Sequence, residues 1–169
     1  MSDARDREVL RERARALARP PAAPAPPGEV LPVLLFDLGG EPHALEIRHV
    51  LAVMPSTPIA VIPAGPPVLA GVVNYRGGAL AVFDPRPLLG LRPGGEGRRV
   101  VVVGDEAEPL GLLVDGLPTV GRLRRDALSA GGGLSLGVTE SGVVLLDGEA
   151  LLGDDRLVVD QGTGTGRVG

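Results

Sequence analysis

Only a few side chains in this sequence have types and spacings that could support chemistry. His43 and His49 are the two histidines, and they lie six residues apart along one predicted strand. Strand rise places them roughly 20 Å from each other even if they share a face, which is too far for a common metal ion. We therefore expect both to be surface histidines. The pair Asp154 and Asp155 lies in a predicted turn, where we expect solvated rather than catalytic carboxylates.

The motifs of nucleophilic and nucleotide chemistry are missing or out of context. The chain has no cysteine, no Gly-x-Ser-x-Gly sequence and no lysine, so a thiol nucleophile, a serine elbow and a Walker A loop are excluded. Gly164, Gly166 and Gly169 match a dinucleotide-binding pattern, but no helix follows to receive a pyrophosphate. We expect no catalytic residue, no enzyme activity, no cofactor and no metal site.

Composition indicates a globular protein of modest size. The 169 residues are 44% hydrophobic and 22% charged, which suits one compact domain or two very small subdomains sharing a core. The net charge of -4 argues against a nucleic-acid-binding surface. Asp, Glu and Arg are frequent between positions 3 and 19, so we expect no secretory signal and a cytoplasmic location.

One uncharged stretch, Leu51 to Tyr75, is long enough to cross a bilayer. Five prolines interrupt it, and each removes a backbone donor and disturbs helix geometry. We interpret it as a water-soluble loop between strands, and we expect no direct membrane insertion.

The chain divides into a predicted N-terminal helix, a linker, a folded domain and a tail. Residues 1–19 form an Arg-rich helix that Ser2 can cap, with Leu10, Ala14, Leu17 and Ala18 as an apolar stripe. This helix is either solvated or docks on a partner or an acidic surface. Residues 20–29 form a Pro/Ala linker, residues 30–160 the domain and residues 161–169 a flexible tail.

Short apolar segments separated by turn residues predict an all-β domain. The predicted strands are 31–38, 43–53, 68–74, 79–83, 100–103, 110–114, 134–138 and 143–146. Arg76-Gly77-Gly78 predicts a hairpin turn between two of them. Strands of this length and spacing are typical of barrels or sandwiches rather than of βαβ units.

The sequence also contains an internal repeat. Residues 34–53 and 101–120 each place a strand before a Glu-Pro turn and a second strand. Each unit continues into a Gly-Val pair, at Gly71 and at Gly137, and ends in similar segments, 82–90 and 145–153. We therefore predict two similar β subdomains. Asp84 and Asp147 occupy matching positions after a strand, where we expect each to cap a short helical turn.

The stretch from Gly71 to Asp84 resembles the signature of the CheW family. That signature has a glycine, two apolar residues, asparagine, an apolar residue and Arg-Gly, followed by an apolar strand ending in Val-x-Asp. Here Asn74, Tyr75, Arg76 and Gly77 stand in its central part, and the sole Asn and sole Tyr of the chain both lie there. The resemblance extends over roughly residues 30 to 159.

The resemblance implies a fold and a non-catalytic function. The fold would be two interlocked five-stranded SH3-like barrels, and the protein would be a scaffold that couples chemoreceptors to a histidine kinase. Its partners would be the regulatory domain of a CheA-type kinase and the helical tip of a chemoreceptor's cytoplasmic part, held in a groove between the subdomains. The partner-binding residues would be Val50, Ala52, Asn74, Tyr75, Arg76 and Gly77. At Ala52 the family often has an acid that can pair with the motif arginine.

A nucleic-acid-binding module is the alternative function. It would use the six arginines of residues 1–19 on a small barrel. The acidic composition and the shortage of aromatic residues for base stacking argue against it.

Overall fold

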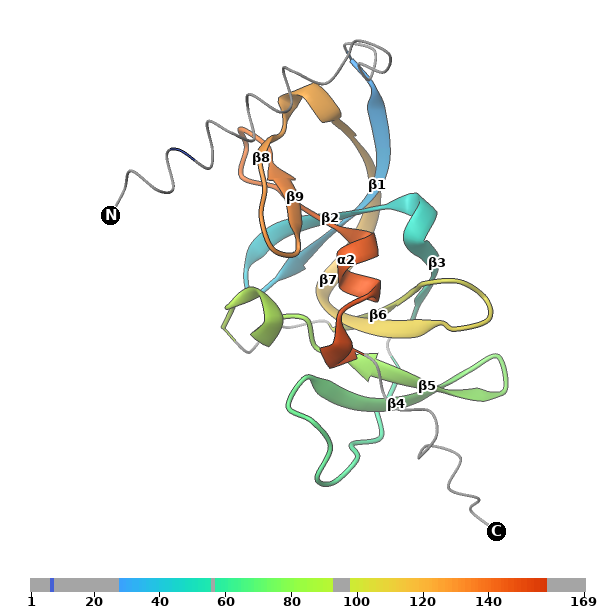
Figure 1. Cartoon of the computed structure of the whole chain (residues 1–169). Helices are drawn as coiled ribbons and strands as arrows, with labels where there is room; N and C mark the ends of the chain where they lie inside the picture. Colours follow the sequence, from blue (N-terminus) through green and yellow to red (C-terminus); the bar gives the residue numbers. More distant parts are fainter. Residues whose placement is uncertain (1–6, 8–27, 56, 93–97, 158–169) are drawn as a thin grey trace.

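The computed structural model describes residue 7 and residues 28–55, 57–92 and 98–157 (Figure 1). The predicted helix over residues 1–19, apart from Arg7, therefore lies outside the described residues. The same holds for most of the predicted linker at 20–29 and for the tail at 161–169.

The described chain is mostly β, in agreement with the predicted fold class. In order, its elements are β1 (Val30–Leu38), β2 (Glu41–Glu46), η1 (Ile47–His49), β3 (Val50–Met54), β4 (Leu69–Tyr75), β5 (Gly78–Phe83), η2 (Pro87–Leu89), β6 (Arg99–Val103), β7 (Leu110–Arg124), η3 (Arg125–Ala127), β8 (Ser129–Ala130), β9 (Ser135–Val138), β10 (Val144–Leu146), α2 (Gly148–Leu152) and η4 (Asp155–Leu157).

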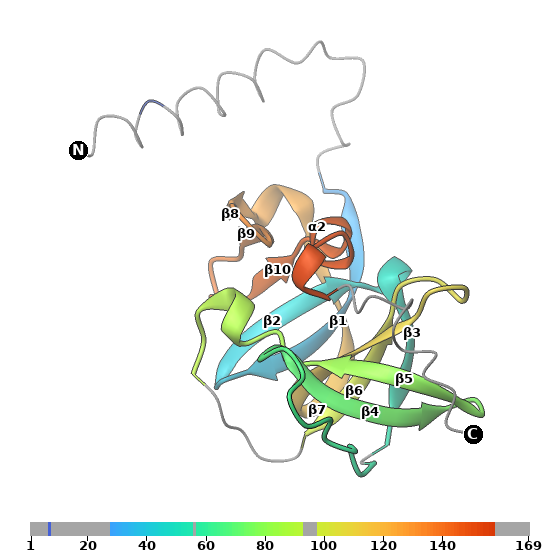
Figure 2. The ribbon, with the colours of Figure 1, turned by 60° about the horizontal axis from the view of Figure 1, so that its bottom comes forward.

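The strands form two half-sheets joined by one long strand (Figures 1 and 2). Half-sheet A contains β1, β2, β8, β9, β10 and the C-terminal part of β7, whereas half-sheet B contains β3, β4, β5, β6 and the N-terminal part of β7. Between these parts β7 passes through Gly116, whose φ of 69° bends the strand. Among the described residues, no strand pairing closes either half-sheet into a ring.

Each half-sheet combines strands from both sequence repeats. The β1–β2 hairpin of the first repeat pairs in parallel with β10 of the second, at Ala44 opposite Leu145. The β6–β7 hairpin of the second repeat pairs in parallel with β5 of the first, at Gly111 opposite Val82. These positions are equivalent in the repeat, so the pairing register repeats with the sequence. The two repeats are therefore interlocked rather than arranged side by side.

The predicted single strand 43–53 is wrong, because a 3-10 turn divides it. Glu46 ends β2 in half-sheet A, and Val50 begins β3 in half-sheet B. The chain must change sheets between these residues, and η1 makes that change. At the equivalent crossing in the second repeat, the bent β7 runs on continuously, so this strand is longer than the predicted 110–114.

The core consists of aliphatic side chains with two phenylalanines, Phe36 and Phe83, both buried. The prediction that both histidines lie at the surface is wrong. His43 is 2% exposed, because it lies on β2 beside β10, and its Nδ1 is 2.9 Å from the carbonyl oxygen of Glu41. His49 is 9% exposed in η1.

Candidate functional site

The turn between β4 and β5 presents the predicted motif residues at one end of half-sheet B (Figure 2). Arg76 and Gly77 have φ values of 49° and 81°, and the side-chain oxygen of Asn74 accepts a hydrogen bond from the Gly77 N–H at 3.2 Å. This geometry requires the Asn and Gly of the motif. It leaves Arg76 exposed, with its guanidinium 5.2 Å from the centroid of the Tyr75 ring.

A small pocket lies beside this turn. Its lining residues are Leu51, Tyr75, Arg76, Glu106 and Pro109, from β3, the β4–β5 turn and the β6–β7 turn. Glu106 therefore brings a carboxylate side chain to this pocket. Ala52, at the position where the family often has an acid, has no carboxylate. Among the described residues, no carboxylate forms an ion pair with the Arg76 side chain.

The remaining predicted partner-binding residues are not part of that pocket. Val50 packs against the main core cluster, while Ala52 packs against the second cluster, between β4, β5 and β6. A register shift in the β3–β6 pairing lies between Val50 and Ala52, at Leu51. Leu51, but neither of its two neighbours, therefore lines the pocket beside Tyr75 and Arg76.

A larger hollow, here called the inter-sheet groove, adjoins the pocket and shares Pro109 with it. It has a volume of about 540 Å³ and lies between β5, the β6–β7 turn, α2 and η4. Its lining residues are His49, Ala79, Ala81, Phe83, Gly104, Asp105, Glu108, Pro109, Leu110, Glu149, Leu152 and Leu157. The lining residues from β5 are apolar, whereas the carboxylates of the β6–β7 turn and of α2 form an acidic rim.

The charged residues of the groove are all acidic. The Asp105 carboxylate accepts hydrogen bonds from the N–H groups of Ala107 and Glu108, at 2.9 and 2.8 Å, and so is fixed in its turn. Glu108 and Glu149 are exposed. Arg48 lies 3.4 Å from Glu149, in an exposed pair that is weak in water. Since no Arg is among the lining residues, the rim favours a basic occupant.

Two local interactions hold the α2 side of the groove. The His49 ring packs against Gly148, where any side chain would overlap the ring. Beyond α2, the hydrogen bond from the Arg156 side chain lowers the pKa of Asp154 to about 2. That ion pair fixes η4, which ends at Leu157 on the groove.

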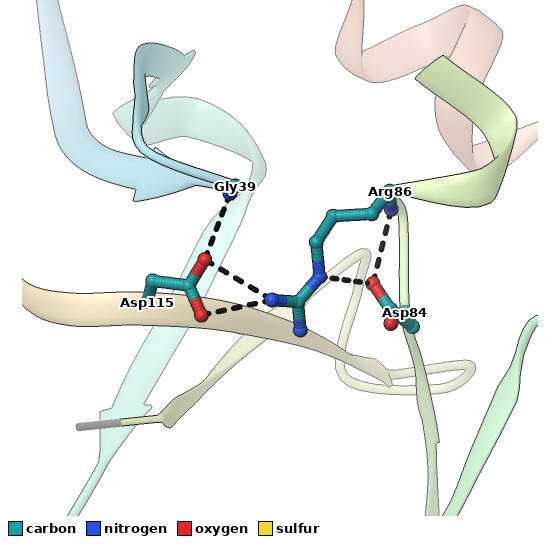
Figure 3. Close-up of polar contacts among 4 residues, drawn as sticks. All are labelled: Gly39, Asp84, Arg86 and Asp115. Atoms are coloured by element: carbon teal, nitrogen blue, oxygen red, sulfur yellow. Dashed lines mark hydrogen bonds and ion pairs between the residues drawn. The ribbon is translucent and has the colours of Figure 1, made fainter. Parts of the chain in front are cut away.

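A buried ionic cluster joins the two half-sheets (Figure 3). Arg86 is 0% exposed, and its Nη1 donates to both carboxylate oxygens of Asp115, at 3.0 and 3.1 Å. Its Nε and its backbone N–H donate to Asp84, at 2.9 and 3.0 Å. Asp115 also accepts a hydrogen bond from the Gly39 N–H at 2.8 Å. The end of β5 and the bend of β7 therefore meet at one guanidinium, and the β1–β2 turn joins them through Asp115.

Sequence reasoning missed this cluster. The available signal was Asp115, a single acid directly after the apolar run Leu112 to Val114 and before Gly116, because a buried charge requires a partner. The expectation that Asp84 caps a short helical turn is also wrong, because Asp84 belongs to the same cluster. Asp84 forms a turn with the Arg86 N–H and an ion pair with its side chain, and it does not cap η2.

The expectation for Asp147 is confirmed. Its side chain accepts a hydrogen bond from the Ala150 N–H at 3.1 Å and caps α2. The repeat thus places an aspartate at equivalent positions, but only the second one has a capping role.

The described residues contain no group of three or more His, Cys, Asp or Glu side chains that could hold a metal ion. Within the same residues, no helix has the length and apolar character needed to cross a membrane. The site combines an exposed cation at Arg76 with an adjoining groove that has an acidic rim and apolar lining residues.

Comparisons with known proteins agree on one family of relatives. The model of the CheW-like domain matches residues 32–159. A "Probable chemotaxis protein CheW" of Rhizobium etli is 29% identical over 90 residues, which cover 52% of this chain and 58% of that protein's length. The scaffolding protein TtCheW from Thermoanaerobacter tengcongensis has a similar fold, with a TM-score of 0.60 and 21% identity over 70% of this chain and 90% of that one.

Proposed function

Because this chain belongs to the CheW-like domain family, we propose that it is a non-catalytic scaffold coupling chemoreceptor-like proteins to a CheA-type histidine kinase in the cytoplasm. We further propose that residues 30–160 make up the CheW-like domain and that each half-sheet, which no strand pairing closes among the described residues, takes the place of one predicted SH3-like barrel. The relative from Rhizobium etli supports a chemotaxis role through its name, and the solved relative through its description as a scaffolding protein.

The observation that carries this proposal is that the exposed Arg76 turn lies next to the inter-sheet groove. A helix docks best where apolar residues contact its apolar face and charged residues fix its orientation at the edges. The groove has such a floor, formed by Ala79, Ala81 and Leu152, and Pro109 connects it to the Arg76 pocket. We place the receptor's helical tip in this groove, with Arg76 as its polar contact at one end.

The test is a pair of calorimetric titrations with the purified full chain. One titrant is the regulatory domain of the cognate kinase, and the other is a helical hairpin corresponding to the receptor tip. We expect each to bind with a Kd on the order of 10 μM or lower, which is about -7 kcal/mol. A protein that binds neither titrant at that concentration would not be a coupling scaffold.

The substitution Arg76→Glu should weaken partner binding without unfolding the protein. The side chain is exposed, so the melting temperature should change little. A reversed charge at the contact should lower affinity by about tenfold or more, which corresponds to ~1.4 kcal/mol. The measurement is the titration of both partners together with a thermal melt.

The matched control is Arg122→Glu, which makes the same charge change at an exposed position of half-sheet A. Partner affinity should remain near that of the unmodified chain in this control. A large loss of melting temperature in Arg76→Glu would mean that this arginine is structural. Equal losses of affinity in both variants would mean that only net charge matters.

A further inference from the structure

The inter-sheet groove is an acidic-rimmed surface whose occupant should carry both apolar and basic residues. Glu108 and Glu149 are both exposed and line the groove from two elements, the β6–β7 turn and α2. Apolar side chains of β5 and α2 also line it, including Ala81 and Leu152. An amphipathic helix with arginines beside its apolar stripe would match this arrangement.

The sequence of residues 9–19 predicts such a helix in the chain itself. Between residues 9 and 19 there are four arginines and one glutamate, so this part is basic although the chain as a whole is acidic. At helical spacing, Leu10, Ala14 and Leu17 fall on one face. Arg11 and Arg13 then lie on either side of that face. The segment and the groove are thus complementary in both charge and apolar surface.

The segment is also long enough to reach the groove. In half-sheet A, Val33 pairs with Glu46, and His49 at the groove follows after one 3-10 turn. The path from Gly28 to His49 is therefore on the order of 30 Å at most. Residues 20–27 span about 25 Å when extended, and residues 1–19 add about 28 Å as a helix.

We propose that residues 1–19 of this chain dock in its own inter-sheet groove and occupy the place that a partner helix would take. The docking follows from charge, apolar pattern and reach alone. Its consequence, that a receptor tip must displace the segment, rests on the proposed function. A tether this short supplies an effective concentration on the order of millimolar, so even a weak contact with a Kd near 1 mM would be formed about half of the time.

The test uses the full chain with a nitroxide label at one introduced cysteine. The sequence has no cysteine, so Ala16→Cys gives a single labelling site, on the opposite side of the predicted helix from the apolar stripe. We expect the amide signals of Gly104, Glu108 and Leu152 to lose about half or more of their height relative to the reduced label, because docking places the nitroxide beside the groove.

Charge-reversal variants give the matched controls. In the labelled chain, Arg11→Glu with Arg13→Glu should abolish the signal loss at the groove, and so should Glu108→Lys with Glu149→Lys. Combining all four substitutions should restore it, since each contact is again between opposite charges. All of these positions are outside the described residues or exposed, and the amide spectrum itself reports whether each variant folds.

Three results would overturn the inference. They are an absence of signal loss at the groove, a loss that survives either reversal, and a loss that appears when labelled chain broadens an unlabelled copy instead of itself. Because no partner protein is present in this experiment, it decides self-docking whatever the titrations show. A receptor tip that fails to bind even Arg11→Glu with Arg13→Glu would contradict the proposed function instead.

Discussion

Replacing Arg86 with methionine is expected to lower the free energy of unfolding by about 3–5 kcal/mol, which is the usual cost of removing one partner of a buried ion pair. The substitution removes two hydrogen bonds to Asp115 and one to Asp84 and leaves the Asp115 carboxylate, 5% exposed, in the interior. A buried charge without compensation costs more than the pair contributed when intact. The effect should be larger than that of most single substitutions in this chain.

The measurement is urea unfolding followed by circular dichroism, with the slope m compared between variants. Arg124→Met is the control, since it removes an ion pair with Asp126 that is exposed on both sides. That control should unfold close to the unmodified protein. Arg86→Lys should retain the charge but lose the planar fork that contacts two carboxylates, so most of the destabilisation should remain.

Replacing both charges tests whether the loss of stability comes from the unpaired Asp115 carboxylate. Arg86→Met combined with Asp115→Leu removes the uncompensated carboxylate and should recover much of the lost stability. The half-sheets would then be joined by apolar contact at the bend of β7, without the hydrogen bond from Gly39. If the single variant Arg86→Met unfolded like the control, the cluster would not be the joint between the half-sheets.

Local patterns were sufficient to predict most of the strands, the hairpin turn and the repeat. The β4–β5 hairpin follows from Gly77 and Gly78 between apolar strands, and the cap at Asp147 follows from its position before a short helical turn. These features depend on neighbouring residues in the sequence. The pairing of β5 with β7 cannot be predicted from neighbouring residues, because the two repeats have similar sequence patterns. The local pattern would be satisfied equally well if each repeat closed on itself.

The errors have a related cause. The histidines are buried by β10 and α2, which lie about 100 residues further along the chain. The break at η1 is needed only because β2 and β3 belong to different half-sheets. Periodicity within one segment carries no information about either contact.

The candidate site was predictable only in part. Asn74, Tyr75, Arg76 and Gly77 are contiguous, so the sequence alone identified the turn. The inter-sheet groove is formed by residues of several separate segments, and Leu51, beside the register shift, lines the pocket next to the turn. The family match fixes the fold but not which of these surfaces meets which partner.

Leu145→Ala is expected to lower the free energy of unfolding by about 2–5 kcal/mol. Leu145 is 0% exposed on β10, opposite Ala44 of β2, at the position where the second repeat pairs with the first. Its side chain packs with Leu31, Val33 and Ala44. Truncation would leave a cavity that this rigid sheet junction can fill only partly, and an unfilled cavity adds to the lost transfer free energy.

The same urea titration measures this effect, with Leu117→Ala as the control at a 71%-exposed position of β7. The control should change stability by less than about 0.5 kcal/mol. The equivalent residue of the first repeat, Val82, is also 0% exposed and pairs with Gly111, so Val82→Ala should be destabilising but less so, since fewer side-chain carbon atoms are removed. If Leu145→Ala behaved like Leu117→Ala, the interlocked pairing of the repeats would not be what stabilises this fold.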